Sequence, residues 1–380
     1  MANKKTRSFK PIIAEYWSRF QAPLFSFLSG VVEEPLTGKL EKLVVIWDIV
    51  EIEEHVRNGF GSWTGRPELD RRKMARVFVA KAVYNLPTTE AALELLRTHR
   101  ALRCLCGYEC IREIPSSATF SRAFKEFADT GLGDVVHKHL VAEHIGDQIV
   151  MHNSRDSTEV VARERPTAKE KKNDEPAKPK QKRGRPKKGE VRPPKEDKRL
   201  DVQLRQSPGV ALQEISKVCD WGAKKDTGGH MHTWKGYKAH IDWADGGVPI
   251  NVVTTSASVH DSQLAIPMAR ISAGRVNILY ELMDSAYDAP QIRTAIENLG
   301  HVPIIDPNPR RGGVPEEKIF DPATANRYKE RTTAERGNSR LKDEFGLRNL
   351  RVRGHAKVHL HIMLGVIDLF ADQIARPIKA

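Results

Sequence analysis

The stretch RYKERTTAERGNSRLKDEF (residues 327–345) mixes cations and carboxylates in a pattern that fits one face of a helix. At about 100° per residue, four side chains of different chemistry fall within roughly 60° of one another. They are Tyr328, Arg331, Glu335 and Lys342. The spacing predicts a helix from Asp321-Pro322 to Phe345-Gly346, because Asp and Pro suit a first turn. An apolar stripe lies beside this face, so Glu335 is expected at the edge of a buried surface, flanked by cations.

Two interpretations of this helix are open from charge patterning alone. A solvated helix with ion pairs four residues apart is the general one. The pattern Tyr-x2-Arg-x3-Glu-x6-Lys is more specific, because chance supplies it on the order of once in several hundred chains of this length. It resembles the signature of the Tyr-Arg-Glu-Lys class of DDE transposases of bacterial insertion sequences. That resemblance requires two aspartates upstream, each leaving a β-strand.

Two aspartates meet this requirement. In DQIVMHNSRDSTEVV (residues 147–161), an apolar core predicts a strand that ends near Asp156. In ILYELMDSAYD (residues 278–288), Asp284 directly follows an apolar strand. Both then lie at carboxyl ends of strands, where ligand sites collect in α/β sheets. The alternative for Asp156 is a structural role as a turn or cap residue. Asp288 is better placed than Asp284 to cap the next helix, which leaves Asp284 without a structural role.

The segments around these aspartates alternate between strands and helices. Residues 233–258 predict two strands joined at the turn Asp245-Gly246-Gly247. A helix, a strand, a second helix and a second strand follow up to residue 307. A hairpin followed by β-α-β units predicts a mixed sheet with helices on its faces. The fold class is therefore α/β, and the resemblance implies an RNase H-like mixed sheet of five strands, preceded by an all-helical N-terminal domain.

Composition divides the chain into regions. Residues 1–70 carry aromatic segments of helical character with no clear role, residues 71–145 form a helical region that is a possible DNA-binding domain, and the resemblance implies that residues 146–376 form the catalytic domain. In the second region, residues 86–97 and 114–129 predict helices capped by Thr88 or Thr89 and by Ser116 or Ser117. The later helix presents Arg122 and Lys125 outward, as a helix-turn-helix reader of the DNA major groove does. A plain bundle helix has the same pattern, so both interpretations stay open.

A basic, proline-rich segment interrupts the catalytic domain over residues 163–230. Between residues 163 and 199 it has no aromatic residue and a strong cationic excess, which predicts a largely disordered insert. Within it, the run from Arg183 through Gly184 and Arg185 to Pro186 resembles the core of an AT-hook. Such a segment lies in the narrow minor groove of A·T-rich DNA. A generic basic linker is the alternative.

Overall charge and composition agree with a DNA-binding protein. The chain has 380 residues, a formal net charge of +13 and a hydrophobic fraction of 39%. This charge favours a polyanionic partner, with double-stranded DNA expected ahead of an anionic membrane surface. The sequence has no run of about 18 apolar residues, so no membrane span is expected. Four cysteines fit a reducing cytoplasm, and Cys104, Cys106 and Cys110 lack the spacing that is typical of zinc sites.

The resemblance also implies a mechanism. Asp156, Asp284 and Glu335 would hold two Mg²⁺ or Mn²⁺ ions, which serve phosphoryl transfer at DNA. The implied phosphate-binding and base-stacking side chains are Tyr328, Arg331, Lys342, Arg348, Arg351 and Arg353. The enzyme would bind terminal inverted repeats, cleave at the element ends and join the 3′-OH to target DNA, as a homodimer in the bacterial cytoplasm, associated with the nucleoid.

Two other functions stay open from the sequence. One is a DNA-binding protein with an inactive site, and the other is a metal-dependent nuclease without strand transfer. The sequence also departs from part of the family. Asp284 and Glu335 are 51 residues apart, which leaves no room for the β-rich insertion that some members carry. Handling of a hairpin intermediate is therefore not implied.

Overall fold

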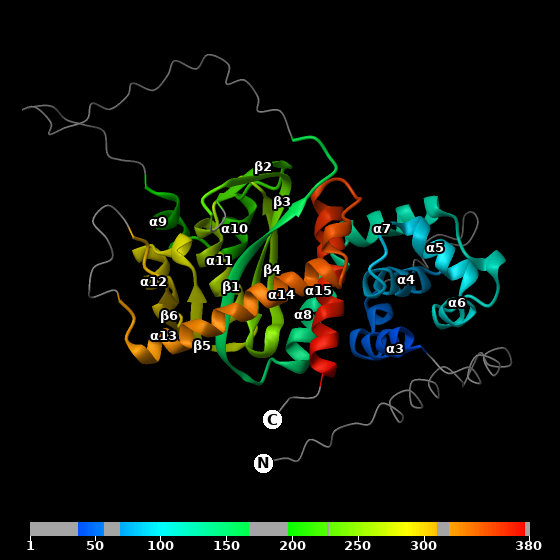
Figure 1. Ribbon diagram of the computed structural model, residues 1–380, viewed down its shortest axis with the longest axis horizontal. Helices are drawn as coiled ribbons and strands as arrows, with labels where there is room; N and C mark the ends of the chain where they lie inside the picture. The colour runs from blue at the N-terminus through cyan, green and yellow to red at the C-terminus, as the bar shows by residue number, and fades with distance from the viewer. Residues whose placement is uncertain (1–36, 57–68, 167–196, 226–227, 310–318, 377–380) are drawn as a thin grey trace, which may run out of the picture.

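A mixed six-stranded sheet and a group of helices make up the described part of the chain in this computed structural model (Figure 1). The described residues are 37–56, 69–166, 197–225, 228–309 and 319–376. The strands are β1 Ile149–Val161, β2 Asp220–Lys225, β3 Met231–Ala244, β4 Val248–Ser256, β5 Asn277–Met283 and β6 Val302–Ile305. Their order is β2-β3-β1-β5-β6, and β4 pairs with β3. The α/β class and the mixed sheet are as predicted.

The expectation of five strands is wrong, because β2 adds a sixth. It pairs antiparallel with residues 231–236, the first half of β3, whereas β1 and β4 pair with the second half. The sequence of β2, DWGAKK, is polar and has no β-branched residue, so it carries little strand propensity of its own. Its partner decides its conformation, because the first half of β3 offers backbone groups that need hydrogen bonds.

Strand β1 is longer than predicted. It does not end near Asp156 but continues to Val161, with Asp156 opposite Ile241 of β3. Its first half runs parallel to β5, and its second half continues past the end of β5 in antiparallel pairing with β3. The predicted hairpin of β3 and β4 is confirmed, with its turn at Asp245–Gly247. Asp156 therefore lies where β1 passes beyond the end of its parallel neighbour.

Helices cover both faces of the sheet. On one face lies α11 (Ser262–Ala273), which contacts β3, β4 and the short helices around it. These short helices are α9 Arg199–Gln203, α10 Pro208–Gln213 and α12 Pro290–Glu297. On the other face, α14 (Thr332–Asp343) crosses β1 and β3. It continues α13 (Pro322–Tyr328) through a 3₁₀ turn at Lys329–Arg331, so the helix predicted up to Phe345 ends two residues earlier.

The helices before the sheet form a second group beside it (Figure 1). They are α3 Gly38–Val50, α4 Arg71–Val83, α5 Thr89–Thr98, α6 Arg100–Leu105, α7 Ser117–Asp129 and α8 Leu132–His144. The predicted caps are confirmed, since Thr88 Oγ1 accepts from Ala91 N at 3.1 Å and Ser116 Oγ accepts from Thr119 N at 3.4 Å. Residues 1–36 and 57–68 lie outside the described residues.

The C-terminal helix α15 (His355–Ala375) joins the two groups. It packs against α3, α4, α7 and α8 on one side and β4 on the other, within one continuous apolar core. Its length and composition are sufficient for a membrane span. Most of its side chains are buried inside the protein, so it is the central helix of the fold.

Part of the basic insert is folded. The helices α9 and α10 and the strand β2 all lie within residues 163–230, which were expected to be largely disordered. Leu200 and Leu204 of this segment pack on the core around α11 and α12, and the Arg270 guanidinium donates to three backbone carbonyls of residues 203–206. Tertiary contacts therefore order the end of the insert. The AT-hook-like segment with Arg183 and Arg185 lies outside the described residues.

Candidate active site

Three carboxylates approach one point from separate segments of the chain. Ser154 of β1 pairs with Leu282 of β5, so two residues further along each strand place Asp156 and Asp284 at the same level. Glu335 comes from the first turn of α14, which crosses the sheet above β1. Asp156 and Asp284 are 128 positions apart in the sequence, and Glu335 lies 51 positions after Asp284. The end of one parallel strand pair and one crossing helix thus bring the three residues together.

Arg331 lies between all three carboxylates. Its Nη2 is 3.5 Å from Asp156 Oδ1 and 3.6 Å from Asp284 Oδ2, and its Nη1 donates to Glu335 Oε1 at 3.0 Å. The Arg331 side chain is 17% exposed, whereas that of Glu335 is 61% exposed. Arg331 was expected to face DNA phosphates, but here its guanidinium acts as the shared counter-ion of the three acidic side chains.

Burial dominates the electrostatics of Asp156. It raises the pKa of this carboxyl to about 6, although Arg331 acts to lower that pKa and Asp284 adds a smaller upward effect. The ionised form also accepts a hydrogen bond on Oδ2 from Asn338 Nδ2 at 3.0 Å. Because one guanidinium does not offset the burial of the charge, the site favours additional positive charge beside Asp156.

The donor set fits hard divalent cations. All three side chains offer carboxylate oxygens, the ligands that Mg²⁺ and Mn²⁺ prefer. Within the described ranges, no group of three acidic, His or Cys side chains is already arranged to hold one metal ion. The guanidinium of Arg331 lies at the point where the carboxylates converge. The residues therefore match a metal site in chemistry, with a protein cation between them.

A buried ion pair supports the strands beneath the carboxylates, and sequence reasoning missed it. Arg155, next to Asp156, is fully buried, with Nε 2.7 Å from Asp242 Oδ1 of β3 and Nη2 3.3 Å from Glu281 Oε2 of β5. Burial lowers the pKa of Arg155, but Asp242 and Glu281 together raise it above its usual range. The signal was visible as charged residues inside otherwise apolar strands. This cluster joins β1, β3 and β5 just below the candidate site.

Two further residues of α14 position the site. Asn338, one turn after Glu335, is buried and donates to Asp156. Gly337 packs on Trp243 of β3 so closely that an added Cβ would lie 2.5 Å from the indole Cζ3. A glycine at this position lets the helix backbone approach the sheet. The sequence shows both residues only as neighbours of Glu335.

The expected division of roles between Asp284 and Asp288 is wrong. Asp284 has a structural contact, because its Oδ1 accepts from Ala286 N at 3.0 Å. Asp288 does not cap α12, whose N-cap is Ala289. It accepts instead from Arg293 Nη2 at 3.1 Å and from Asn308 N at 3.1 Å. Asp288 lies one residue too early for the cap because Pro290 begins the helix.

Several of the predicted DNA-binding cations already have acidic partners. Lys342 Nζ is 3.6 Å from Glu159 Oε1 of β1, and Arg348 Nε is 2.8 Å from Asp343 Oδ1. The Tyr328 ring packs on Phe320, with 5.3 Å between ring centroids. Arg351 and Arg353 are exposed and make no ion pair with the described residues. The predicted cationic face thus divides into paired side chains around the carboxylates and unpaired ones farther along the chain.

Helix α7 presents Arg122 and Lys125 to solvent, as predicted. Arg122 Nη2 donates to Thr119 Oγ1 at 3.3 Å, and Lys125 Nζ is 3.1 Å from Asp129 Oδ2. The helix α6 and a 3₁₀ turn separate α7 from α5, which is a longer connection than the turn of about 3–4 residues in a helix-turn-helix motif. The arrangement therefore differs from a simple helix-turn-helix pair.

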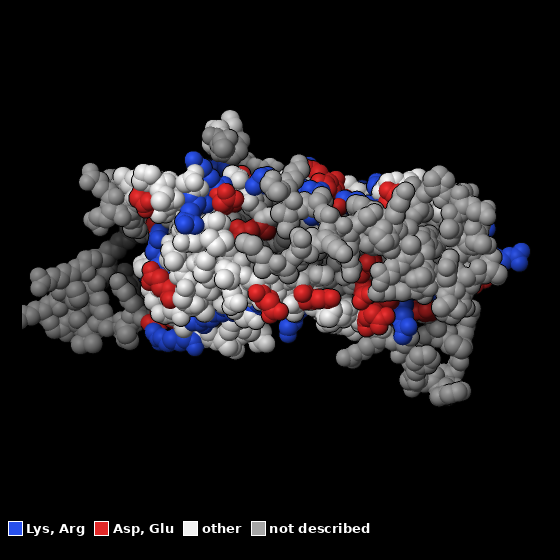
Figure 2. All heavy atoms as spheres, turned by 90° about the horizontal axis from the view of Figure 1, so that it is seen from below, with Lys and Arg blue, Asp and Glu red and all other residues white. Residues whose placement is uncertain are grey.

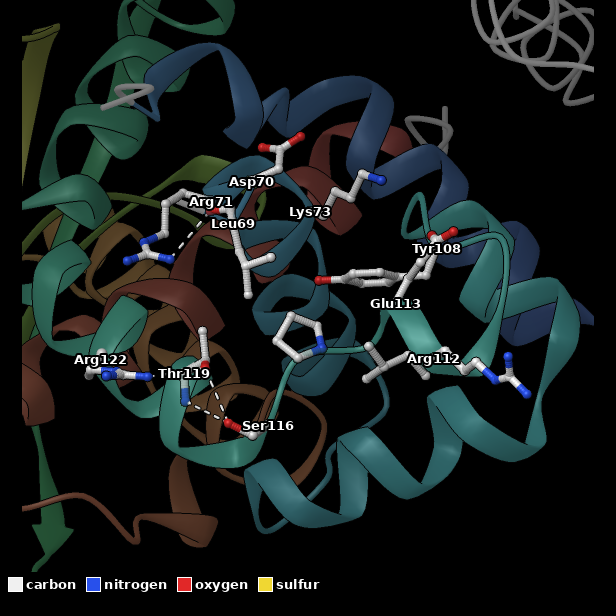
Figure 3. A pocket seen from close by; sticks show the side chains of 12 residues that line it. Leu69, Asp70, Arg71, Lys73, Tyr108, Arg112, Glu113, Ser116, Thr119 and Arg122 are labelled. Carbon is white, nitrogen blue, oxygen red and sulfur yellow. Dashed lines mark hydrogen bonds between the residues drawn. The ribbon is translucent and has the colours of Figure 1, made fainter. Parts of the chain in front are cut away.

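A cavity of about 890 Å³ lies at the start of α7, with Arg122 on its wall (Figure 3). Its lining carries both signs of charge, with basic residues of α4 and α7 beside Asp70 and Glu113. Asp70 caps α4 by accepting from Arg72 N, and Glu113 accepts from Glu109 N. The mixed charge of this wall does not select an anion.

Two families match the chain. The family described as Transposase DDE domain matches residues 156–368, which is more than half of the chain. The family described as Transposase domain (DUF772) matches residues 33–126. No curated protein and no solved structure matches. The first match begins at Asp156 and includes Asp284 and Glu335, whereas the second covers most of the helices before the sheet.

Proposed function

The chain belongs to the family of transposases with a DDE domain, and from this premise we propose that it cuts and joins DNA for a bacterial insertion sequence. In this proposal it has the Tyr-Arg-Glu-Lys signature and an RNase H-like catalytic domain. It binds the terminal inverted repeats, cleaves the strand at each end and uses the 3′-OH to attack target DNA. Two element ends require at least a homodimer, and the protein acts in the cytoplasm at the nucleoid.

One observation carries the assignment of the catalytic residues. The single guanidinium of Arg331 contacts Asp156, Asp284 and Glu335 at 3.0–3.6 Å, although they come from three separate segments. Ordinary surface ion pairs join two charges, and most contribute little to stability. Three carboxylates gathered at the end of β5, one of them only 14% exposed, favour a site that binds cations for chemistry.

Divalent ions, when bound by these three carboxylates, would stabilise the charge that develops on the attacking and leaving oxygens of phosphoryl transfer. The chain's own side chains hold this arrangement in place. Asn338 fixes one oxygen of Asp156, and Arg155 locks the three strands beneath it. Arg331 and Lys342 are the proposed contacts for phosphates beside the cut, and Tyr328 is the proposed contact for a sugar or base.

The assay that tests this function supplies labelled element ends, a plasmid target and Mg²⁺. Cleavage followed by joining of the 3′ end to plasmid is the expected result. Cleavage without joining would support the metal-dependent nuclease instead. Binding without cleavage would support the DNA-binding protein with an inactive site. The DNA that flanks the gene supplies the end sequences for the substrate.

A further inference from the structure

Acidic and basic side chains both occur on the face drawn in Figure 2, so the positive charge is not spread as one uniform surface over the described residues seen there. A local concentration lies elsewhere. A cavity of about 300 Å³ opens between the helices before the sheet and the segment that follows α14. Its polar lining consists mainly of Lys81, Thr88, Thr89, Arg351, Arg353 and Lys357.

The cavity wall carries four cations and no carboxylate. Lys81, Arg351, Arg353 and Lys357 make no ion pair with any residue that the structure describes. Neighbouring cations of the same C-terminal segment do have acidic partners. Arg340 pairs with Glu344 and Asp372, and Arg348 pairs with Asp343. Like charges repel when they share a small cavity, so their gathering here without acids is unfavourable unless an anion joins them.

The need for an anion is clearest at Lys81. It belongs to the last turn of α4, and burial lowers the pKa of its ammonium to about 8. The adjacent His361 adds no charge near neutral pH, because burial and Lys81 lower its pKa to about 4. A partly buried ammonium group without an acidic partner is destabilising. A bound anion would remove that penalty.

Hydrogen bonds fix the two walls of the cavity relative to each other. Asn85, just after α4, donates through Nδ2 to Asp343 O at 2.8 Å. Its Oδ1 accepts from Asn349 Nδ2 at 2.8 Å. These bonds join the loop before α5 to the end of α14 and to the turn before Arg351. The backbone segments that carry the cations are therefore placed before any ligand arrives, which reduces the entropy lost on binding.

We propose that this cavity is a phosphate clamp, which holds one phosphodiester of the DNA backbone between α4 and the segment 351–357. The proposal rests on the proposed function, since it assumes DNA as the partner. Thr88 and Thr89 bring the N-terminus of α5 to the same wall, where its dipole adds positive potential. The clamp ties the DNA path to both parts of the fold, because Arg351 and Arg353 follow the helix that carries Glu335.

The test measures duplex binding by the full chain with Asp156→Asn, so that the DNA stays intact. A short fluorescent duplex of arbitrary sequence is the probe, because phosphate contacts do not depend on base sequence. Lys81→Gln and Arg353→Gln should each weaken binding and reduce the slope of log K against log salt, by no more than about 0.9 because the clamp holds a single phosphate. Arg205→Gln removes the same charge from an exposed side chain already paired with Asp197, and should leave the slope near that of the parent.

A second measurement reports on Lys81 directly. Lys81 is only partly buried and lines the cavity. At a pKa of about 8 more of it is the reactive free amine than in an ordinary lysine, so an acylating reagent should modify it and mass spectrometry quantifies the modification. The duplex should protect Lys81 in the parent protein and protect it less when Arg353 is replaced by Gln. The exposed Arg353 also serves as the folding control, since its replacement should not change the melting temperature.

The two possible failures are distinguishable. A parent protein that does not bind the duplex at all overturns the proposed function together with the clamp. Normal binding by the parent, with unchanged salt slopes in both variants and no protection of Lys81, overturns the clamp alone. A slope that falls equally in Arg205→Gln would also overturn it, because the effect would then follow net charge and not this cavity.

Discussion

Arg331 Nη2 lies 3.5 Å from Asp156 Oδ1, yet burial still leaves the pKa of Asp156 raised to about 6. The cost of burying the carboxylate therefore exceeds the stabilisation that the guanidinium supplies. The same guanidinium also serves Asp284 and Glu335, so its single charge is shared among three acids. The positive charge placed among these acids therefore does not offset the burial of Asp156.

We expect Asp156→Asn, Asp284→Asn and Glu335→Gln each to abolish DNA cleavage while DNA binding persists. The amides keep the shape of the side chains but remove the charge that holds divalent ions. Cleavage of a labelled duplex in Mg²⁺ and binding of the same duplex, measured in parallel, check this. A variant that cleaves at nearly the parent rate would show that its residue is not part of the triad.

Asp156→Asn should also make the metal-free protein more stable at high pH. The folded-state pKa of about 6 lies above the ordinary 3.8, so the folded state disfavours ionisation. Stability is then lost as pH rises through this window, by roughly 3 kcal/mol at most on the usual conversion of pKa into free energy. Melting curves in EDTA should show a higher melting temperature for Asp156→Asn at about pH 8 and a smaller difference at about pH 5. A constant difference at all pH values would contradict the buried-carboxylate argument.

Arg331→Gln should strengthen metal binding and weaken the metal-free fold. Without the guanidinium, three carboxylates face one another unneutralised, and a divalent ion meets less competition. We expect Mn²⁺ to bind roughly tenfold more tightly, a change of about 1.4 kcal/mol. Calorimetry or the electron paramagnetic resonance signal of free Mn²⁺ measures this without any DNA.

The matched control for Arg331 is Arg336→Gln on the same helix. Arg336 is exposed and donates to Thr333 Oγ1, with no contact to the three carboxylates. Its replacement should leave Mn²⁺ affinity unchanged. Equal affinity in Arg331→Gln and the parent would mean that Arg331 does not occupy the place where a metal ion would bind.

Gly337→Ala should lower both stability and cleavage. In an exposed helix this change stabilises by about 1 kcal/mol through helix propensity. Here the new Cβ would lie 2.5 Å from Trp243, and overpacking of this kind costs about 1–3 kcal/mol. The helix must shift away from the sheet and take Glu335 with it. Ser339→Ala, at an exposed position two residues later, is the control that should retain cleavage; a melting temperature above that of the parent for Gly337→Ala would refute the close approach.

Local patterns were sufficient for several elements. The Thr88 and Ser116 caps, the turn at Asp245–Gly247 and the helix that carries Glu335 follow from short-range chemistry, namely side-chain hydrogen bonds, backbone freedom and helical periodicity. The strand before Asp284 was predicted because it is a short apolar run. In each case the information lies within about 10–15 residues, the window over which periodicity is read.

Other features depend on partners far away in the sequence. Strand β1 continues past Asp156 because β3 offers backbone partners there, and β2 forms although its own sequence has little strand propensity. The buried cluster of Arg155, Asp242 and Glu281 is visible in the sequence only as misplaced charges. Its members come from three strands, so their pairing appears only after the sheet has formed.

The sequence by itself predicted the three carboxylates and Arg331 of the candidate site, because aspartates in or directly after apolar strands and a spaced Tyr-Arg-Glu-Lys pattern are local properties. Only the tertiary structure decided how they are charged and joined. The register between β1 and β5 places Asp156 beside Asp284, and the contact of Gly337 with Trp243 brings α14 down onto both. Burial and distance then set the pKa of Asp156 and place Arg331 among the acids. Both quantities depend on the surroundings in space, which neighbouring residues in the chain do not specify.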